Sequence, residues 1–297
     1  AGRALLQYAY DRWERPAVSY VLLVGECSLD YLQAYGSQTG NYVPSMQVTS
    51  NWSGDLQVVT SDLWFANLEG ADDSPPEVYI GRFPVSSSAE AATIVAKTLA
   101  YEAAIGAEWR DGAMLIVDDG PPVALQELSE HLRAVMAPAS SLRQFDAGRY
   151  PREGDLSADI TRAIEDGVGI VAFVGHGNVD LWGPWAGGGP IYRDRDIAGL
   201  TNVGRPPILV SGACMNGWID HPLKPKSMTE LWLTHARGGG VAAWSPSGLA
   251  AIEDLSGLVE DFVRALLDPA GTADGPSESR GEASLGACAD RAVRAAA

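Results

Sequence analysis

Short, uninterrupted apolar runs alternate with longer amphipathic stretches along this chain, and this alternation is what most constrains its fold. In the second half the apolar runs lie at residues 113–117, 169–174, 208–210 and 240–244. Each run is continuously apolar, which is typical of parallel strands that are covered on both faces. The amphipathic stretches between them predict helices near residues 123–136, 160–166, 227–237 and 252–267. The pattern therefore predicts an α/β fold with a mainly parallel sheet.

The first half alternates less regularly. Residues 2–14 predict a helix and residues 20–24 a buried strand, whereas 26–76 carry many turn-forming residues and predict loops and short strands. A strand is expected at 77–83. A capping box of Ser87 and Glu90 then predicts a helix that reaches about residue 104.

A polar stretch at residues 108–112 is the predicted seam between the two halves. A chain of 297 residues is long enough for about two compact units. We therefore expect two side-by-side α/β subdomains with mainly parallel sheets, made of residues 1–107 and 108–297.

Charge and cysteine content narrow the classes of function. The chain has 38 acidic and 21 basic residues and a net charge of −17, so a nucleic acid or an anionic membrane surface would be repelled. Three cysteines are too few for a disulfide framework. No apolar run approaches the roughly 20 residues of a membrane span, so none is predicted.

Two of the predicted strands run directly into residues that can carry chemistry. One leads into Gly175-His176-Gly177 and the other into Cys214. Ligands of parallel sheets bind beyond the carboxyl ends of the strands, so we expect the imidazole and the thiol at one sheet edge. A nearby histidine suits cysteine acyl transfer, because a thiol must become a thiolate and an amine leaving group needs a proton. The N–H groups of Gly177 and Cys214 are the candidate oxyanion hole.

Each of these residues also has a plainer interpretation. A cysteine after an apolar strand is often a small core hydrophobe, and a histidine between glycines is often a turn residue. Cys214 and His221 lack the spacing of a zinc site, and no metal site is predicted from them. Cys27 and Cys288 are predicted to be structural.

Several longer sequence blocks occur in a fixed order. A hydrophobic block that ends in His-Gly, followed by one that ends in Ala-Cys, is similar to the signature of the caspase–legumain–gingipain clan of cysteine peptidases. The finer match resembles the gingipain-like family (peptidase family C25) and runs from about residue 21 to the last helix. Its blocks are SDLWFA (61–66), PEVYIGRFPV (76–85), GHGNVDLWG (175–183), GACMNGW (212–218) and GGGVAAWSPSGL (238–249).

The resemblance implies that the second subdomain is caspase-like and holds the catalytic pair. His176 and Cys214 match the family's catalytic histidine and cysteine. The family's third acid follows the strand before the first helix of that subdomain, where this chain has Asp118-Asp119-Gly120. Asp119 is the candidate we select there, and an acid that stabilises a helix N-terminus is the alternative interpretation.

The resemblance gives no cleavage preference. Arg-cleaving relatives place an acid in the next helix, whereas residues 124–126 here are Ala-Leu-Gln. Those relatives also cap the pocket with a Trp from the loop after the last strand. In this chain Trp244 lies earlier, inside that strand. We assign neither Arg nor Lys specificity, and the candidate substrate-binding residues are Asp180, Trp182, Trp244 and Ser245.

The resemblance implies no cofactor for catalysis and raises the possibility of structural calcium. Oxygen-rich loops suit that ion, and a solvated acidic loop is the alternative interpretation. The acidic residues concerned are Asp55, Asp62, Asp72, Asp73 and Glu77.

The function expected from this sequence is hydrolysis of peptide bonds by a Cys-His dyad through an acyl-thioester. The expected binding partners of the chain are a protein or peptide substrate and flanking pro- or C-terminal domains of a larger precursor. The expected location is the exterior or surface of a bacterial cell. Two alternatives stay open: acyl transfer by a transpeptidase or sortase of the same fold, and a non-catalytic adhesion or scaffold domain.

Overall fold

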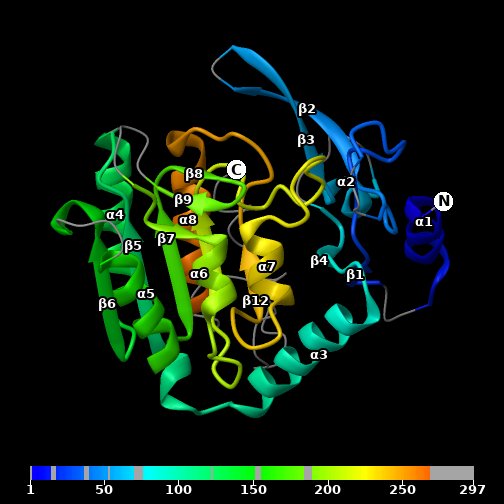
Figure 1. The fold of residues 1–297 in the computed structure, drawn as a ribbon. Helices are drawn as coiled ribbons and strands as arrows, with labels where there is room; N and C mark the ends of the chain where they lie inside the picture. The colour runs from blue at the N-terminus through cyan, green and yellow to red at the C-terminus, as the bar shows by residue number, and fades with distance from the viewer. Residues whose placement is uncertain are drawn as a thin grey trace.

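The computed structural model of this chain (Figure 1) describes residues 2–14, 18–36, 40–52, 54–69, 76–121, 123–150, 155–183 and 189–267. The predicted last helix with Cys288 lies outside these residues. Within them, no helix has both the length and the apolar character needed to cross a membrane.

A five-stranded parallel sheet forms the centre of the larger unit (Figure 1). Its order is β12-β11-β7-β5-β6. The register pairs Val174 with both Val117 and Gly212, so three central strands end side by side at one edge of the sheet. This confirms the predicted parallel sheet. The strands are β5 (Gly112–Val117), β6 (Ser141–Asp146), β7 (Ile170–Val174), β11 (Ile208–Gly212) and β12 (Ala242–Trp244).

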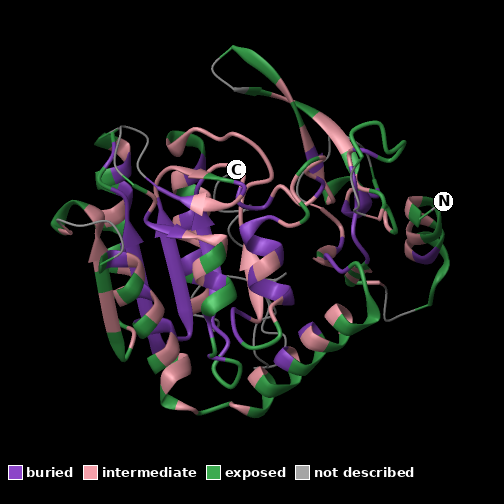
Figure 2. Cartoon of the chain, viewed as in Figure 1, coloured by how far each residue is buried: buried purple, intermediate pink, exposed green. Residues whose placement is uncertain are grey.

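Helices cover this sheet on both faces, which explains why its strands are apolar throughout. Ala113 and Leu115 of β5 belong to a core with α4 and α8, whereas Met114 and Ile116 belong to a core on the other face. Figure 2 shows the central strands as buried. The first face carries α4 (Val123–Met136) and α8 (Ile252–Leu267), and the second carries α3 (Ser88–Ala103), α5 (Asp155–Asp166), α6 (Asp194–Gly199) and α7 (Met228–Thr234).

The smaller unit contains two pairs of strands. Strands β1 (Tyr20–Val24) and β4 (Tyr79–Phe83) are parallel, and β2 (Met46–Trp52) and β3 (Asp55–Ser61) form an antiparallel hairpin. Two helices complete it, α1 (Gly2–Arg12) and α2 (Leu63–Ala66). The hairpin lies within the stretch where loops and short strands were predicted.

Helix α3 precedes the predicted seam in sequence but packs on the larger unit. The seam itself is a short 3₁₀ helix, η1 (Glu108–Asp111). Ile94 of α3 packs into the core of the larger unit. The Lys97 ammonium donates to the carbonyls of Trp232 and Leu233, 3.1 and 2.9 Å away, at the C-terminal end of α7. The predicted boundary after residue 107 therefore assigns α3 to one unit although its buried side packs on the other.

Sequence patterns missed the edge strand β6, whose sequence is not continuously apolar, and several shorter elements. A second 3₁₀ helix, η2 (Ala147–Arg149), follows β6. A small antiparallel sheet contains β8 (Gly177–Asn178), β9 (Leu181–Trp182) and β10 (Tyr192–Arg193). Strands of two residues are too short to produce a periodic pattern. This sheet matters for the site because β8 begins one residue after His176.

Candidate active site

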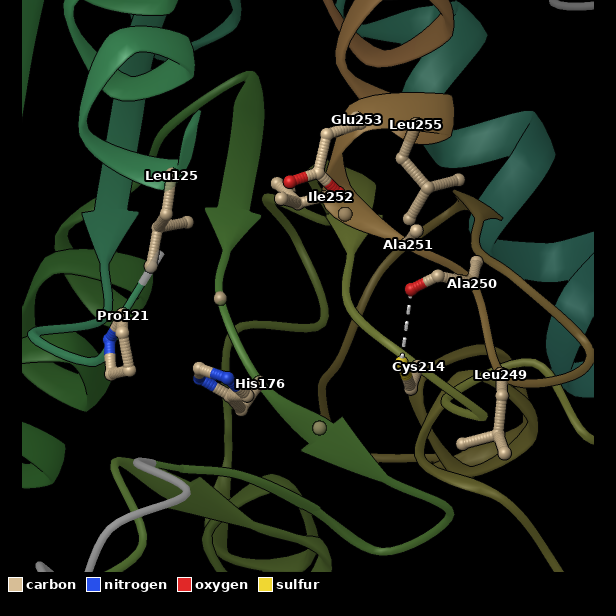
Figure 3. Close-up of a pocket in the computed structure, with 13 residues that line it drawn as sticks. Pro121, Leu125, His176, Cys214, Leu249, Ala250, Ala251, Ile252, Glu253 and Leu255 are labelled. Atoms are coloured by element: carbon tan, nitrogen blue, oxygen red, sulfur yellow. Dashed lines mark hydrogen bonds between the residues drawn. The ribbon is translucent and has the colours of Figure 1, made fainter. Parts of the chain in front are cut away.

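The ends of β7 and β11 bring His176 and Cys214 to one cavity. The two strands are parallel neighbours, so the residues that follow them leave the sheet at the same edge. Both side chains line a cavity of about 360 Å³, and Figure 3 shows them entering it from adjacent segments. Imidazole and thiol therefore lie at the same edge of the sheet.

His176 is held by Asp118, which follows β5. The Asp118 Oδ2 lies 2.8 Å from the imidazole Nδ1 and also accepts from the His176 backbone N–H at 2.9 Å. The Asp118 side chain is fully buried. Because Nδ1 is engaged by the carboxylate, a proton exchanged with a substrate would pass through the other ring nitrogen, Nε2.

This geometry corrects the predicted third acid. Asp119 is exposed and lies beside Gly148, whereas its neighbour Asp118 contacts His176. Successive residues of an extended chain point to opposite sides. Consequently only one of two adjacent acids can face the imidazole, and the sequence did not indicate which.

Two glycines let these segments approach each other. A Cβ on Gly175, whose φ is +155°, would lie 2.3 Å from the Asp118 Cβ. A Cβ on Gly120 would lie 2.8 Å from the imidazole Cε1. Any larger residue at either position would push Asp118 and His176 apart.

Cys214 lies in a tight turn directly after β11. Its thiol donates to the carbonyl of Ala250, with Sγ and O 3.4 Å apart. The next residue, Met215, has a φ of +58°, an unusual conformation for a side-chain-bearing residue. Its N–H bonds the Gly248 carbonyl at 3.0 Å. The turn therefore exposes the thiol to the cavity while the 248–250 segment holds it from the other side.

The candidate oxyanion donors lie on adjacent segments. A Cβ on Gly177 would be 2.8 Å from the Ala213 Cβ and 3.1 Å from the Cys214 carbonyl oxygen, so the two backbones are in close contact. The Gly183 N–H bonds the His176 carbonyl. Hydrogen-bonded pairs alternate along an antiparallel ladder, so the N–H of Gly177 points away from β9. The assignment of Gly177 and Cys214 to an oxyanion hole stays a prediction, and this geometry is compatible with it.

A buried amide joins the histidine segment to the cysteine turn. The Asn216 Oδ1 accepts from Trp182 Nε1 and from Ser211 Oγ, both at 2.7 Å, and its Nδ2 donates to the carbonyls of Asn178 and Leu181. Sequence reasoning missed Asn216, whose only signal was its place two residues after Cys214. It fixes the β8–β9 hairpin against the turn that carries Cys214.

The predicted substrate-binding residues lie elsewhere. Trp182 is fully buried and stacks between Phe173 and Tyr192, so it belongs to the core. Trp244 stacks on Phe262 of α8. Trp182 and Trp244 are drawn inward because large aromatic surfaces are favourable to bury.

The two polar candidates have structural partners as well. Asp180 pairs with Lys224, and the Ser245 hydroxyl lies 2.7 Å from the Thr229 hydroxyl. Neither lines the cavity that holds Cys214. Part of the wall comes from the two stretches that were compared with the pocket of Arg-cleaving relatives, residues 124–126 and the loop after the last strand, although none of their residues was a candidate. The residues of the wall are Pro121, Leu125, Leu249, Ala250, Ala251, Ile252, Glu253 and Leu255.

The hairpin of the smaller unit supports this wall. The Gln57 side chain on β3 donates to the Leu249 carbonyl at 2.7 Å and accepts from the Leu249 N–H at 3.0 Å. The Ser247 hydroxyl donates to the Thr60 carbonyl at 2.7 Å. The segment that contacts the Cys214 thiol is therefore positioned by residues more than 180 positions away in sequence.

A pair of buried acids lies where the two units meet. Glu26 follows β1 and Glu230 lies in the first turn of α7, and both are almost completely buried. The Oε1 atoms of both acids are buried and pair with no described donor, and a proton shared between the two carboxyl groups would satisfy both. Burial raises the pKa of Glu230 well above its ordinary value, and Glu26 strengthens the shift. Burial also raises the pKa of Glu26, against opposing effects of its bond to Glu230 and of Lys226.

Two of the proposed calcium ligands that the structure describes bind other groups, whereas Asp55 is exposed at the start of β3. Asp62 forms a salt bridge with Arg82 at 2.6 Å, and Glu77 accepts hydrogen bonds from the backbone of Leu68 and Glu69. Asp72 and Asp73 lie outside the described residues. Among described residues, no three His, Cys, Asp or Glu side chains gather as a metal site would require. Calcium binding stays a prediction.

Comparison with protein families gives a match that covers nearly the whole chain. The profile of peptidase family C25 matches residues 1–295. Among curated proteins, Gingipain R2 of Porphyromonas gingivalis is 27% identical over 170 residues, which is 54% of this chain and 22% of that protein. Gingipain R1 of the same species is also 27% identical over 170 residues, or 16% of its length. The chain thus spans about a fifth of these relatives.

Solved structures support the same fold. The crystal structure of the Arg-specific cysteine proteinase gingipain R superposes with a TM-score of 0.74 at 17% identity, covering 99% of this chain and 62% of that one. The complex of pro- and mature domains of RgpB from Porphyromonas gingivalis gives the same TM-score and identity, covering 63% of its chain. The fold is therefore the caspase-like arrangement seen in gingipain R.

Proposed function

The chain belongs to peptidase family C25, and from that premise we propose that it is a cysteine endopeptidase whose nucleophile is Cys214. The observation that carries the proposal is the shared cavity of Cys214 and His176, with Asp118 bonded to Nδ1 of His176. A cysteine that served only as packing would have no reason to face a cavity beside an oriented imidazole.

In the acylation step, the Cys214 sulfur forms a bond to the carbonyl carbon of the scissile peptide. The thiol proton passes through Nε2 of His176 to the departing nitrogen as the C–N bond breaks. The amine leaves, and the acyl group remains on Cys214 as a thioester. While negative charge develops on the carbonyl oxygen, the N–H groups of Gly177 and Cys214 donate to it.

In the deacylation step, water attacks the thioester carbon. Its oxygen forms the new C–O bond, the C–S bond breaks, and one water proton returns through His176 to the thiol. The carboxylic acid product leaves and the enzyme is restored. Asp118 acts as a positioning residue, because it holds the ring and stabilises the imidazolium that forms transiently.

The substrate and setting follow from the same premise. A peptidase acts on a protein or peptide substrate. The known complex of RgpB pro- and mature domains motivates a flanking pro-domain in a longer precursor. A location outside the bacterial cell or on its surface completes the proposal.

The test is cleavage of a fluorogenic peptide library by the native protein, Cys214→Ala and the matched control Cys27→Ala. Burial raises the pKa of the Cys27 thiol, and that residue is not among those that line the cavity. We expect Cys214→Ala to lose at least about 1,000-fold in rate and Cys27→Ala to remain active if folded.

Product masses separate the alternatives. Products that carry an added amine would indicate acyl transfer in place of hydrolysis. Equal activity of Cys214→Ala and native protein, or a thiol probe that never labels Cys214, would overturn the proposal and favour a scaffold.

A further inference from the structure

The cavity beside Cys214 has two facing walls of apolar side chains, one from the start of α4 and one from the start of α8. Pro121 and Leu125, at the start of α4, lie on one side in Figure 3. Ile252 and Leu255, at the start of α8, lie on the other, and Leu249 lies beside the thiol. Apolar surface predominates in this lining.

The inner end of the cavity is also apolar. Leu125 is 1% exposed and Leu255 is 8% exposed, and both continue into the core beneath α4 and α8. A substrate side chain that reached this end would therefore contact hydrocarbon. A cationic group there would lose its water beside side chains that offer no hydrogen-bond partner, which is unfavourable.

Among the described residues that line the cavity, Glu253 alone carries a carboxylate. It is exposed to solvent, in contrast to Leu125 and Leu255. It also lies in the first turn of α8, where the N-terminal end of the helix dipole favours a negative charge. Water screens an exposed carboxylate, so its attraction for a substrate cation is weak.

The cavity is adjacent to the reacting atoms. Gly175, Gly177 and Gly212 line it together with His176 and Cys214. A peptide whose carbonyl carbon lies at the thiol would thus place the side chain of the same residue, P1, between α4 and α8. The volume of about 360 Å³ is ample for a side chain of the size of leucine, methionine or phenylalanine.

We propose that this cavity is the P1 binding site and that it selects substrates with a large apolar side chain immediately before the scissile bond. The inference rests on the proposed peptidase function. It assigns to this chain a substrate class different from the arginine named for gingipain R.

The test uses peptidyl acyloxymethyl ketones that differ only at P1. The thiolate of Cys214 displaces the carboxylate of such a probe: the S–C bond forms, the C–O bond breaks, and a stable thioether remains. Intact mass measures the labelling rate on the full chain, and Cys214→Ala controls for labelling elsewhere.

The decisive comparison is norleucine against lysine at P1. These side chains share the same four carbons and differ by the terminal ammonium group. We expect the norleucine probe to label Cys214 at least about 10-fold faster, because poor pairing of a buried polar group costs that much or more. Faster labelling by lysine or arginine probes, lost in Glu253→Gln, would overturn the inference and leave the peptidase proposal intact.

A variant of the inner wall tests the position of the pocket. Leu125→Ala lengthens the cavity, so the rate ratio of phenylalanine to leucine probes should rise about 10-fold over the native ratio. The ratio within one sample does not depend on the folded fraction. The matched control is Val123→Ala, an exposed position on the same helix, which should keep the native ratio.

The remaining outcomes are also informative. An unchanged ratio in Leu125→Ala would overturn the placement of P1 between α4 and α8. If no probe labelled Cys214 in the folded native chain, the proposed function itself would fail, and this inference with it.

Discussion

Replacing Asp118 with asparagine removes one negative charge from beside His176 and leaves the size of the side chain almost unchanged. In the native chain Oδ2 lies 2.8 Å from Nδ1 and accepts the backbone N–H at 2.9 Å, and Oδ1 accepts from the Gly120 N–H at 3.2 Å. An asparagine can offer only one oxygen. Its NH₂ group must therefore face either His176 or the N–H of Gly120.

The size of the effect follows from these contacts. A hydrogen bond to a charged group contributes about 1.5–3 kcal/mol, against about 0.5–1.5 kcal/mol for a neutral one. The imidazolium that forms during acylation also loses its counter-charge. Together we expect a loss of about 2–4 kcal/mol in the transition state, which corresponds to a rate about 30 to 1,000 times lower.

The assay compares the cleavage rates of a peptide anilide and a peptide phenyl ester that have the same acyl group. The concentration of active enzyme is measured by titration with an acyloxymethyl ketone. His176 protonates the departing nitrogen of the anilide, whereas a phenolate leaves without a proton. Asp118→Asn should therefore slow the anilide more than the ester. The matched control is Asp119→Asn, because Asp119 is adjacent and exposed.

Two results would refute this reasoning. One is an anilide rate for Asp118→Asn within about threefold of native protein. The other is an equal loss in Asp119→Asn, which would restore the acid selected from sequence.

Three further changes test other parts of the structure. Glu230→Gln should stabilise the fold by about 1–3 kcal/mol at pH 8 and not at pH 4, as measured by urea unfolding. The pKa of Glu230 is raised in the folded state. Its contribution to the free energy of unfolding is therefore complete below the pKa of the unfolded chain, and it is lost as the pH rises through the folded pKa. A difference from native protein that did not depend on pH would contradict a proton shared with Glu26. Gln57→Ala should raise KM and lower kcat, because it removes the hydrogen bonds that position the cavity wall. The unfolding free energy should change by no more than about 1–2 kcal/mol. Unchanged kinetics would show that the wall keeps its position without Gln57. Trp182→Phe should cost about 1–3 kcal/mol of stability by leaving a hydrogen bond of Asn216 unmade, with the order of P1 preferences unchanged; a new order would restore Trp182 to the substrate pocket.

The sheet and its covering helices were predictable because burial on two faces leaves a strong mark on sequence. Continuous apolar strands and amphipathic helices predicted β5, β7, β11, α4 and α8 close to their observed bounds. Burial of apolar area drives this arrangement whatever the detail of the loops. The two-residue strands near His176 left no such mark.

The two helix N-caps were predictable for a local reason. The full capping box forms at Ser227 and Glu230, whereas Glu90 accepts from the N–H of Ser86 and not of Ser87. Both predicted helix starts are present, and Ser87 and Ser227 accept from the N–H groups of Glu90 and Glu230. A cap depends on residues three positions apart. What no local pattern indicated is that Glu230 would be buried against Glu26, some 200 positions earlier in the chain.

The sequence by itself determined the α/β class, the parallel sheet and the two strand ends that carry His176 and Cys214. The order of apolar and amphipathic segments is a local property of the sequence, and it predicts parallel strands. Parallel strands bring their carboxyl ends to one edge of the sheet. Only the tertiary structure decided that Asp118 holds the histidine and that Trp182 lies in the core. Likewise it decided that Leu125 and Ile252, from two distant helices, face one cavity, because which side chains meet across a cavity depends on how whole elements pack.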